Sequence, residues 1–274
     1  AIVQVLQIPF LGEEELNAAV SNGSLWENSI SLPGESSEYS IFWQTIKKDP
    51  EKNTMSILFV ASRIDEIEKN CDLIRKAGFE PLIVDVRCFA LRNILKTYDE
   101  SVTQKISAFI EISGEENYAV FIYDGLPFIY DIFVSDADMK ALIQGGNEIT
   151  KELFSRLGSQ IRSSVSSFIK QSSAPGIEKI NLVSSLPYFE NLLIGLKEEI
   201  LEFKIDPLQP FSQVYIPAQF KERIESEKNI SSFTVSTGLA TRQLDVFGYF
   251  KFVTAVSNIN LLPGREDNIK KEKE

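Results

Sequence analysis

The chain has 274 residues, a formal net charge of −11 and 43% hydrophobic residues, an ordinary globular composition for one large or two moderate domains. The acidic balance argues against a nucleic-acid surface, because phosphate contacts need clustered lysine and arginine side chains. The absence of histidine excludes a Ser-His-Asp triad, a Cys-His pair and zinc sites built on histidine. No apolar run approaches the roughly 20 residues that span a bilayer, so we expect a soluble protein.

The chain opens with strand patterns on either side of a short helix. Residues 2–8 alternate loosely and stop at Pro9, which is typical of a strand, and residues 39–46 have a second strand pattern. Between them, residues 13–15 are three glutamates. A helix N-terminus favoured by the helix dipole is the preferred interpretation of these glutamates, over a metal site.

The next pattern predicts a helix with one apolar face. Ser62 and Asp65 have the spacing of a capping pair at its start. Gly78 is expected to end it in the left-handed conformation. The side chains expected to be buried recur at steps of four and three residues: Ile67, Cys71 and Ile74.

This helix lies between two apolar runs, 56–62 and 81–86, each of which is typical of a buried strand. Strand, helix and strand at this spacing predict a βαβ crossover, and a second helix is expected over 88–98. Cys71 and Cys88 fall at apolar positions of the two helices. We interpret them as buried thiols and not as a disulfide.

The second half begins with three strand patterns in succession, at 105–113, 117–125 and 126–134, and the pair Asp124-Gly125 is typical of a hairpin. A helix of about 36 Å is predicted over 147–170. The remaining predicted elements are a strand at 179–185, a helix at 188–202, a strand at 202–206, a small-residue helix at 232–244 and a strand at 250–256. This order predicts an α/β layered domain of the ribonuclease H type.

Several motifs, in their order along the chain, resemble the actin-like type IV pilus assembly protein PilM. The resemblance implies an α/β, actin-like ATPase (ribonuclease H-like) fold with a small inserted α/β subdomain, similar to the cell-division protein FtsA. It also implies a place at the inner face of the bacterial inner membrane and binding to the short cytoplasmic tail of the pilus protein PilN. The motifs are VLQIP (5–9), the stretch 56–95, FIEISG (109–114), GGNEIT (145–150) and STGLATRQLD (236–245).

The resemblance implies a division of the chain into four parts. Residues 1–78 correspond to the inserted subdomain, 79–100 return into the first actin-like half, and 101–249 form the second half. Residues 250–274 hold a C-terminal strand or INLLP segment and a charged tail. Because the match begins inside the inserted subdomain, we expect the opening strands of the first half to be missing, as in a truncated chain.

A segment near the C-terminus resembles the INLLP signature of the PilN tail: Ile259, Asn260, Leu261, Leu262 and Pro263. Three interpretations stay open: a native ending, a partner peptide joined to the chain, or a last strand packed on the core. A bound extended peptide uses backbone hydrogen bonds for affinity and side-chain pockets for register. We then expect Ile259, Leu261 and Leu262 to be buried and Asn260 to face the rim, with docking in cis or in trans left open.

The resemblance also allows the nucleotide motifs of actin-like proteins to be checked. The first phosphate hairpin, an Asp-Ile-Gly turn, does not occur in this chain. The second corresponds to Glu111, Ser113 and Gly114, either an altered phosphate site or an ordinary tight hairpin. Ser184 and Ser185 stand where two glycines are expected against adenosine, and their Cβ atoms restrict the backbone and fill that space. We therefore expect no ATP or magnesium on this polypeptide, although a complete chain could hold both.

These observations favour a cytoplasmic scaffold of the inner-membrane pilus assembly complex, active in pilus-driven twitching motility. It would recognise an INLLP-bearing, PilN-like tail, and self-association through the inserted subdomain is a further expectation. No catalytic residue and no metal ligand are assigned. Two alternatives are a nucleotide-regulated actin-like ATPase and the cytoplasmic domain of a type II secretion platform.

Overall fold

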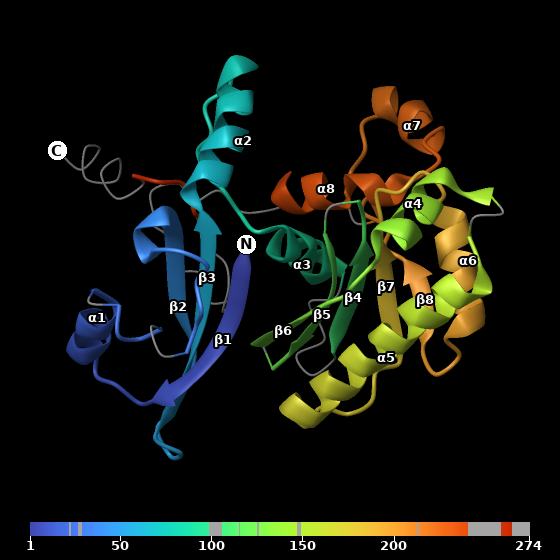
Figure 1. Cartoon of the computed structure of the whole chain (residues 1–274). Coiled ribbons are helices and arrows are strands. Elements are labelled where there is room, and N and C mark those ends of the chain that lie inside the picture. Colours follow the sequence, from blue (N-terminus) through green and yellow to red (C-terminus); the bar gives the residue numbers. More distant parts are fainter. Residues whose placement is uncertain are drawn as a thin grey trace. The chain divides into compact units, whose positions relative to one another are not determined.

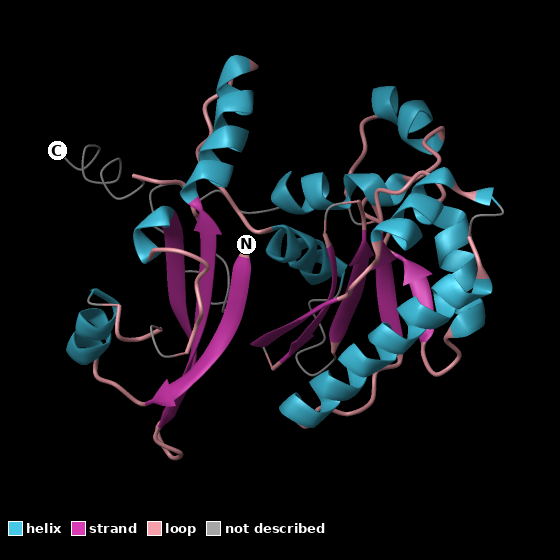
Figure 2. Cartoon of the chain, viewed as in Figure 1, coloured by secondary structure: helices cyan, strands magenta, loops and turns pink. Residues whose placement is uncertain are grey.

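The computed structural model describes residues 1–21, 23–26, 29–98, 106–114, 116–124, 126–146, 149–212, 214–240 and 259–264 (Figure 1). The described chain forms two compact units. The first comprises Ala1–Val86 with the described C-terminal residues 259–264, and the second begins at Arg87. Each unit is built on a sheet of its own (Figure 2).

The sheet of the first unit has the order β1-β3-β2 and is antiparallel throughout. The central strand is almost fully buried, and Phe59 on it packs against Trp26 with ring centroids 5.3 Å apart. Helix α1 begins with the three glutamates, as predicted. The elements are β1 (Ile2–Pro9), α1 (Glu13–Ser21), η1 (Ser36–Glu38), β2 (Tyr39–Asp49) and β3 (Thr54–Arg63).

Helix α2 (Ile64–Lys76) confirms most of the predicted apolar face. Ile67 and Cys71 are buried, but Ile74 is 45% exposed, so the face is one turn shorter than predicted. Gly78 follows the helix with φ +84°, as expected for a residue that ends a helix. Cys71, and Cys88 in the second unit, are buried thiols outside any disulfide, which confirms that interpretation.

The predicted capping pair of α2 is wrong. Ser62 is still part of β3, where it pairs with Ser40 of β2, because the strand continues to the residue before the helix. The N-cap residue is Arg63, which makes no side-chain capping bond. The carboxylate of Asp65 instead accepts a hydrogen bond from Arg63 Nε at 3.0 Å.

The predicted βαβ crossover is also wrong. Residues 79–86 form no strand, and the sheet of this unit has no parallel pair. An apolar run of this kind needs an extended partner, but that partner does not have to be a sheet strand. Here the partner is the C-terminal segment.

The sheet of the second unit has the order β6-β5-β4-β7-β8. Its first three strands form the predicted antiparallel succession, and β4–β7 and β7–β8 are parallel pairs. Asp124 has φ +51° at the β5–β6 turn, while Gly125 lies outside the described residues. The strands are β4 (Ser107–Ile112), β5 (Asn117–Tyr123), β6 (Leu126–Asp131), β7 (Lys179–Val183) and β8 (Lys204–Pro207).

Helices α5 and α6 pack on this sheet to form its core. Helix α5 starts at Lys151, later than predicted, because Thr150 Oγ1 accepts a hydrogen bond from Leu153 N at 3.3 Å and caps it. Helices α4 and α7 were not predicted from the sequence patterns. The helices are α3 (Arg87–Tyr98), α4 (Asp136–Gln144), α5 (Lys151–Ser172), α6 (Phe189–Glu199), α7 (Ala218–Glu225), η3 (Ile230–Phe233) and α8 (Thr234–Ala240).

Some predictions fall where the structure describes nothing: the strand at 250–256, the end of the small-residue helix beyond residue 240, and the charged tail. Among the described helices, none combines the length and the apolar character needed to cross a bilayer.

Helices α3 and α8 approach each other closely at Gly238. A Cβ atom at this position would lie 1.9 Å from the carbonyl oxygen of Ala90, which is backbone and cannot turn away. Asn93 Nδ2 donates a hydrogen bond to the Gly238 carbonyl at 3.3 Å, so the contact is also polar. The resemblance placed this glycine in a family motif, and the structure gives it a steric reason.

We predict that Gly238→Ala lowers the free energy of unfolding by about 1–3 kcal/mol, because α3 and α8 must separate to admit the methyl group. Chemical denaturation followed by circular dichroism measures this change. Gly176→Ala is the control, because a Cβ atom at Gly176 meets no atom within 4 Å. Equal stabilities of the two variants would contradict the close approach.

Candidate functional site

The C-terminal segment, residues 259–263, lies against residues 82–84 of the first unit (Figure 1). The Leu261 N–H donates to the Val84 carbonyl oxygen at 2.8 Å. The side-chain amide of Asn260 makes two more bonds: its Nδ2 donates to the Leu82 carbonyl at 3.1 Å, and its Oδ1 accepts from Val84 N–H at 3.0 Å. Neither partner belongs to a strand, so this is a local pairing of two extended pieces.

The apolar side chains of the segment alternate between buried and partly exposed. Ile259 and Leu261 are each 1% exposed, as expected. The expected burial of Leu262 is wrong: on an extended segment Leu262 faces away from these two anchors, and both Leu262 and Pro263 are half-buried. Gly264 then turns the chain with φ +72°. Each fully buried aliphatic side chain contributes about 1.5–3 kcal/mol before the cost of ordering it. Two such anchors offset part of the cost of ordering a short segment, and the hydrogen bonds to residues 82–84 add to them.

Asn260 does more than the sequence analysis expected. It is half-exposed, but besides its two bonds to residues 82–84, its Oδ1 also accepts from the Leu262 N–H at 3.0 Å. One amide therefore holds three backbone groups. The residue type could have predicted this role, because an amide side chain inside an apolar run can satisfy both backbone donors and backbone acceptors.

The residues that correspond to the nucleotide motifs of actin-like proteins all lie in the second unit, around the ends of the neighbouring strands β4 and β7. Glu111 is fully buried, and its Oε1 accepts from Arg87 Nε at 2.6 Å. The Tyr118 hydroxyl donates to the other carboxylate oxygen. Both oxygens that could orient a magnesium ion are thus engaged by protein groups.

The pKa values agree with this geometry. Burial lowers the pKa of Arg87, but the hydrogen bond and charge of Glu111 more than offset it, so the pKa of Arg87 is raised overall. Burial, and then the charge of Glu111, raise the pKa of Tyr118 far above its usual range. Arg87 stays charged and Tyr118 stays a hydrogen-bond donor throughout the physiological range.

Ser113 and Gly114 form a closed hairpin turn after β4. The Ser113 N–H donates to Asn117 Oδ1 at 2.9 Å and to the Glu116 carbonyl at 3.2 Å. Its hydroxyl donates to the same Glu116 carbonyl at 2.7 Å. A phosphate needs free backbone N–H groups, and this N–H is already used inside the turn.

Ser184 and Ser185 have different surroundings. Ser184 is fully buried, its N–H donates to Ser231 Oγ at 3.0 Å, and its carbonyl accepts from Asn229 Nδ2 at 3.0 Å. Ser185 is exposed. The Asn229 Oδ1 atom is buried without a hydrogen-bond partner in the described chain, but it is an acceptor and cannot bind phosphate oxygens.

Glu111, Ser113 and Ser184 therefore do not fit ATP with magnesium, because the Glu111 carboxylate and the N–H groups of the two serines already bind other protein groups. Among the described residues, no group of three or more aspartates, glutamates or cysteines is placed to hold a metal ion.

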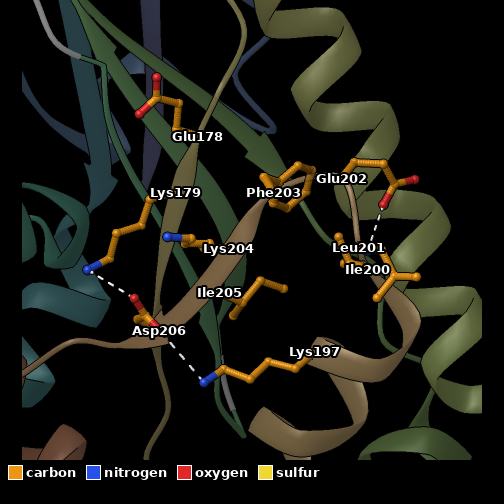
Figure 3. A pocket seen from close by; sticks show the side chains of 10 residues that line it. All are labelled: Glu178, Lys179, Lys197, Ile200, Leu201, Glu202, Phe203, Lys204, Ile205 and Asp206. Atoms are coloured by element: carbon orange, nitrogen blue, oxygen red, sulfur yellow. Dashed lines mark hydrogen bonds and ion pairs between the residues drawn. The ribbon is translucent and has the colours of Figure 1, made fainter.

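A separate cavity of about 810 Å³ lies beside β7 and β8 (Figure 3). Lys179 and Lys197 approach Asp206 from two sides, with Nζ–O distances of 3.2 and 3.6 Å. These ion pairs connect β7, β8 and α6. None of the residues that correspond to the nucleotide motifs lines this cavity.

A family model described as type IV pilus assembly protein PilM matches residues 2–158, more than half of the chain. The chain belongs to the PilM family. The match of the family model confirms the predicted family. The search of curated proteins found no match to the chain.

Among solved structures, the chain is similar to one titled "PilM-PilN type IV pilus biogenesis complex", with TM-score 0.62 and 19% identity over 88% of this chain and 76% of that one. A Bacteroides thetaiotaomicron protein described as having an actin-like ATPase fold matches at TM-score 0.35 and 12% identity, over 73% and 64%. The ethanolamine utilization protein EutJ of Carboxydothermus hydrogenoformans matches with TM-score 0.36 and 10% identity, over 83% of this chain and 98% of that one. The PilM fold and the two mixed α/β units confirm the predicted fold class.

We predict that Asn260→Asp weakens the docking of the segment, because a carboxylate oxygen would face the Leu82 carbonyl in place of the donating amide. Amide hydrogen exchange of Val84 and Leu261 should become about tenfold faster, as expected for the loss of about 1.4 kcal/mol. Pro263→Ala is the control, since Pro263 makes none of these hydrogen bonds. Unchanged protection in Asn260→Asp would refute the amide's role.

We predict that Arg87→Leu costs about 3 kcal/mol of unfolding free energy, because it leaves the buried Glu111 carboxylate without its cation. The value lies at the low end for buried pairs because Arg87 keeps 36% of its side chain in water. The double variant Arg87→Leu/Glu111→Gln should recover most of the loss. A double variant less stable than Arg87→Leu would contradict this account.

Proposed function

We propose that this PilM-family chain is a scaffold of the type IV pilus inner-membrane assembly complex, and that it binds an extended INLLP-type tail, such as that of PilN, at residues 82–84. The observation that carries the proposal is the docked segment itself. Its backbone and its Asn260 amide bind the open backbone of Leu82 and Val84, while Ile259 and Leu261 are buried.

The similar solved structure supports the choice of partner. It is a complex of PilM with PilN, and its fold resembles this chain at TM-score 0.62. At 19% identity the likeness concerns fold, so the partner and the residues that bind it are part of the proposal. The signature at residues 259–263 is the link between the two.

The mode of binding follows from backbone chemistry. Residues 82–84 offer a carbonyl, an N–H and a second carbonyl outside any sheet, the groups that an extended peptide pairs with. The interaction consists of hydrogen bonds to the backbone and contacts of a few side chains. It therefore suits a short extended tail and not a folded surface.

We also propose the domain organisation given by the resemblance, with residues 1–78 as the inserted subdomain and 101–249 as the second actin-like half. Self-association, and attachment to the inner face of the membrane through partners, belong to the same proposal. A nucleotide-regulated ATPase has less support, because Glu111, Ser113 and Ser184 direct their polar groups at protein partners.

The test uses a synthetic peptide of residues 258–266, titrated into a chain that lacks residues 259–274. We expect a dissociation constant on the order of micromolar, as for two buried aliphatic anchors with a few hydrogen bonds. Val84→Pro in that chain removes the N–H that binds Asn260 and should weaken binding on the order of tenfold. Val84→Ala, which keeps the N–H, is the matched control. No binding by the folded, tail-deleted chain would refute the proposed function.

A further inference from the structure

We propose that residues 259–263 act as a built-in competitor: the chain's own segment fills the site at Leu82–Val84, so a tail from another molecule must displace it. This inference rests on the proposed function, because it concerns the occupancy of the same site. It adds a regulated state to that function, in which free tail binds only when the cis segment leaves.

The docked segment has the contacts of a bound peptide and not of a core strand. Three hydrogen bonds join it to Leu82 and Val84 in the described chain, two of them through one side chain. By contrast, β1 pairs with β3 over eight residues. A pairing this short can open without dismantling the sheet.

The tether gives the cis segment an advantage over a free one. A segment that belongs to the same chain as its site reaches an effective concentration of about 1 mM near that site. If the untethered peptide binds with a dissociation constant of about 10 μM, the cis segment reduces the apparent affinity for a free tail about 100-fold. The same two aliphatic anchors and the same amide serve both, so the competition is direct.

The experiment compares three chains with the same labelled peptide of residues 258–266 by fluorescence anisotropy. The chain lacking residues 259–274 should bind it 10- to 100-fold more tightly than the full chain. Full-length Asn260→Asp, whose segment docks less well, should lie between the two. A peptide carrying Asn260→Asp should bind weakly to all three, which checks that the label reports this site.

Several results separate the possibilities. Equal affinities for all three chains would overturn the inference and leave the proposed function intact, whereas no binding by any of them would refute the proposed function. If the deleted chain fails to fold, judged by its circular dichroism, the comparison of the full chain with Asn260→Asp decides alone. Light scattering tests the topology: a full-length dimer that the deletion turns into a monomer would show docking into a second copy and would overturn cis competition.

Discussion

The C-terminal site depends on one interaction, the pairing of the backbone polar groups of Leu82 and Val84 with an extended segment away from any sheet. An unpaired backbone group removed from water costs about as much as a lost hydrogen bond, so the N–H and carbonyl of the half-buried Val84 gain most from this partner, whereas Leu82 is 53% exposed and its carbonyl can also bond to water. The sheet of the first unit has the order β1-β3-β2, and residues 81–86 form no strand in it. Residues 81–86 are therefore left outside it, available to an extended segment.

The second unit solves a different problem, which is a carboxylate buried in the middle of a sheet. Glu111 is stable there because Arg87 neutralises it and Tyr118 hydrogen-bonds it. The arrangement fixes the start of α3 to β4, so the charge of Glu111 serves packing. In the same way, the Ser184 turn is closed by Ser231 and Asn229. Polar groups that are already hydrogen-bonded to one another leave few donors to bind a phosphate.

Sequence patterns predicted the elements that local periodicity determines, such as most of helix α5 and the succession β4-β5-β6. They failed where the decisive contact is distant in sequence. The run 81–86 has the composition of a buried strand, but it pairs with residues 259–261 and not with the sheet. The same holds for Glu111, whose partner Arg87 is 24 residues away. The burial of Ile259 and Leu261 was expected, but the three hydrogen bonds of the Asn260 amide to backbone groups were not.

The polar residue inside the apolar segment explains how so short a peptide holds one register. Side chains of an extended chain alternate between faces, so a slip by one residue would move Asn260 into the space of a buried aliphatic side chain and turn Ile259 and Leu261 outward. The slip would lose both anchors and leave an amide buried without its partners, a penalty of several kcal/mol. A segment with an aliphatic residue at position 260 as well would bind in several registers at similar cost, because each slip would bring another aliphatic side chain to the buried positions. The asparagine therefore contributes specificity more than affinity, because it makes every wrong alignment expensive.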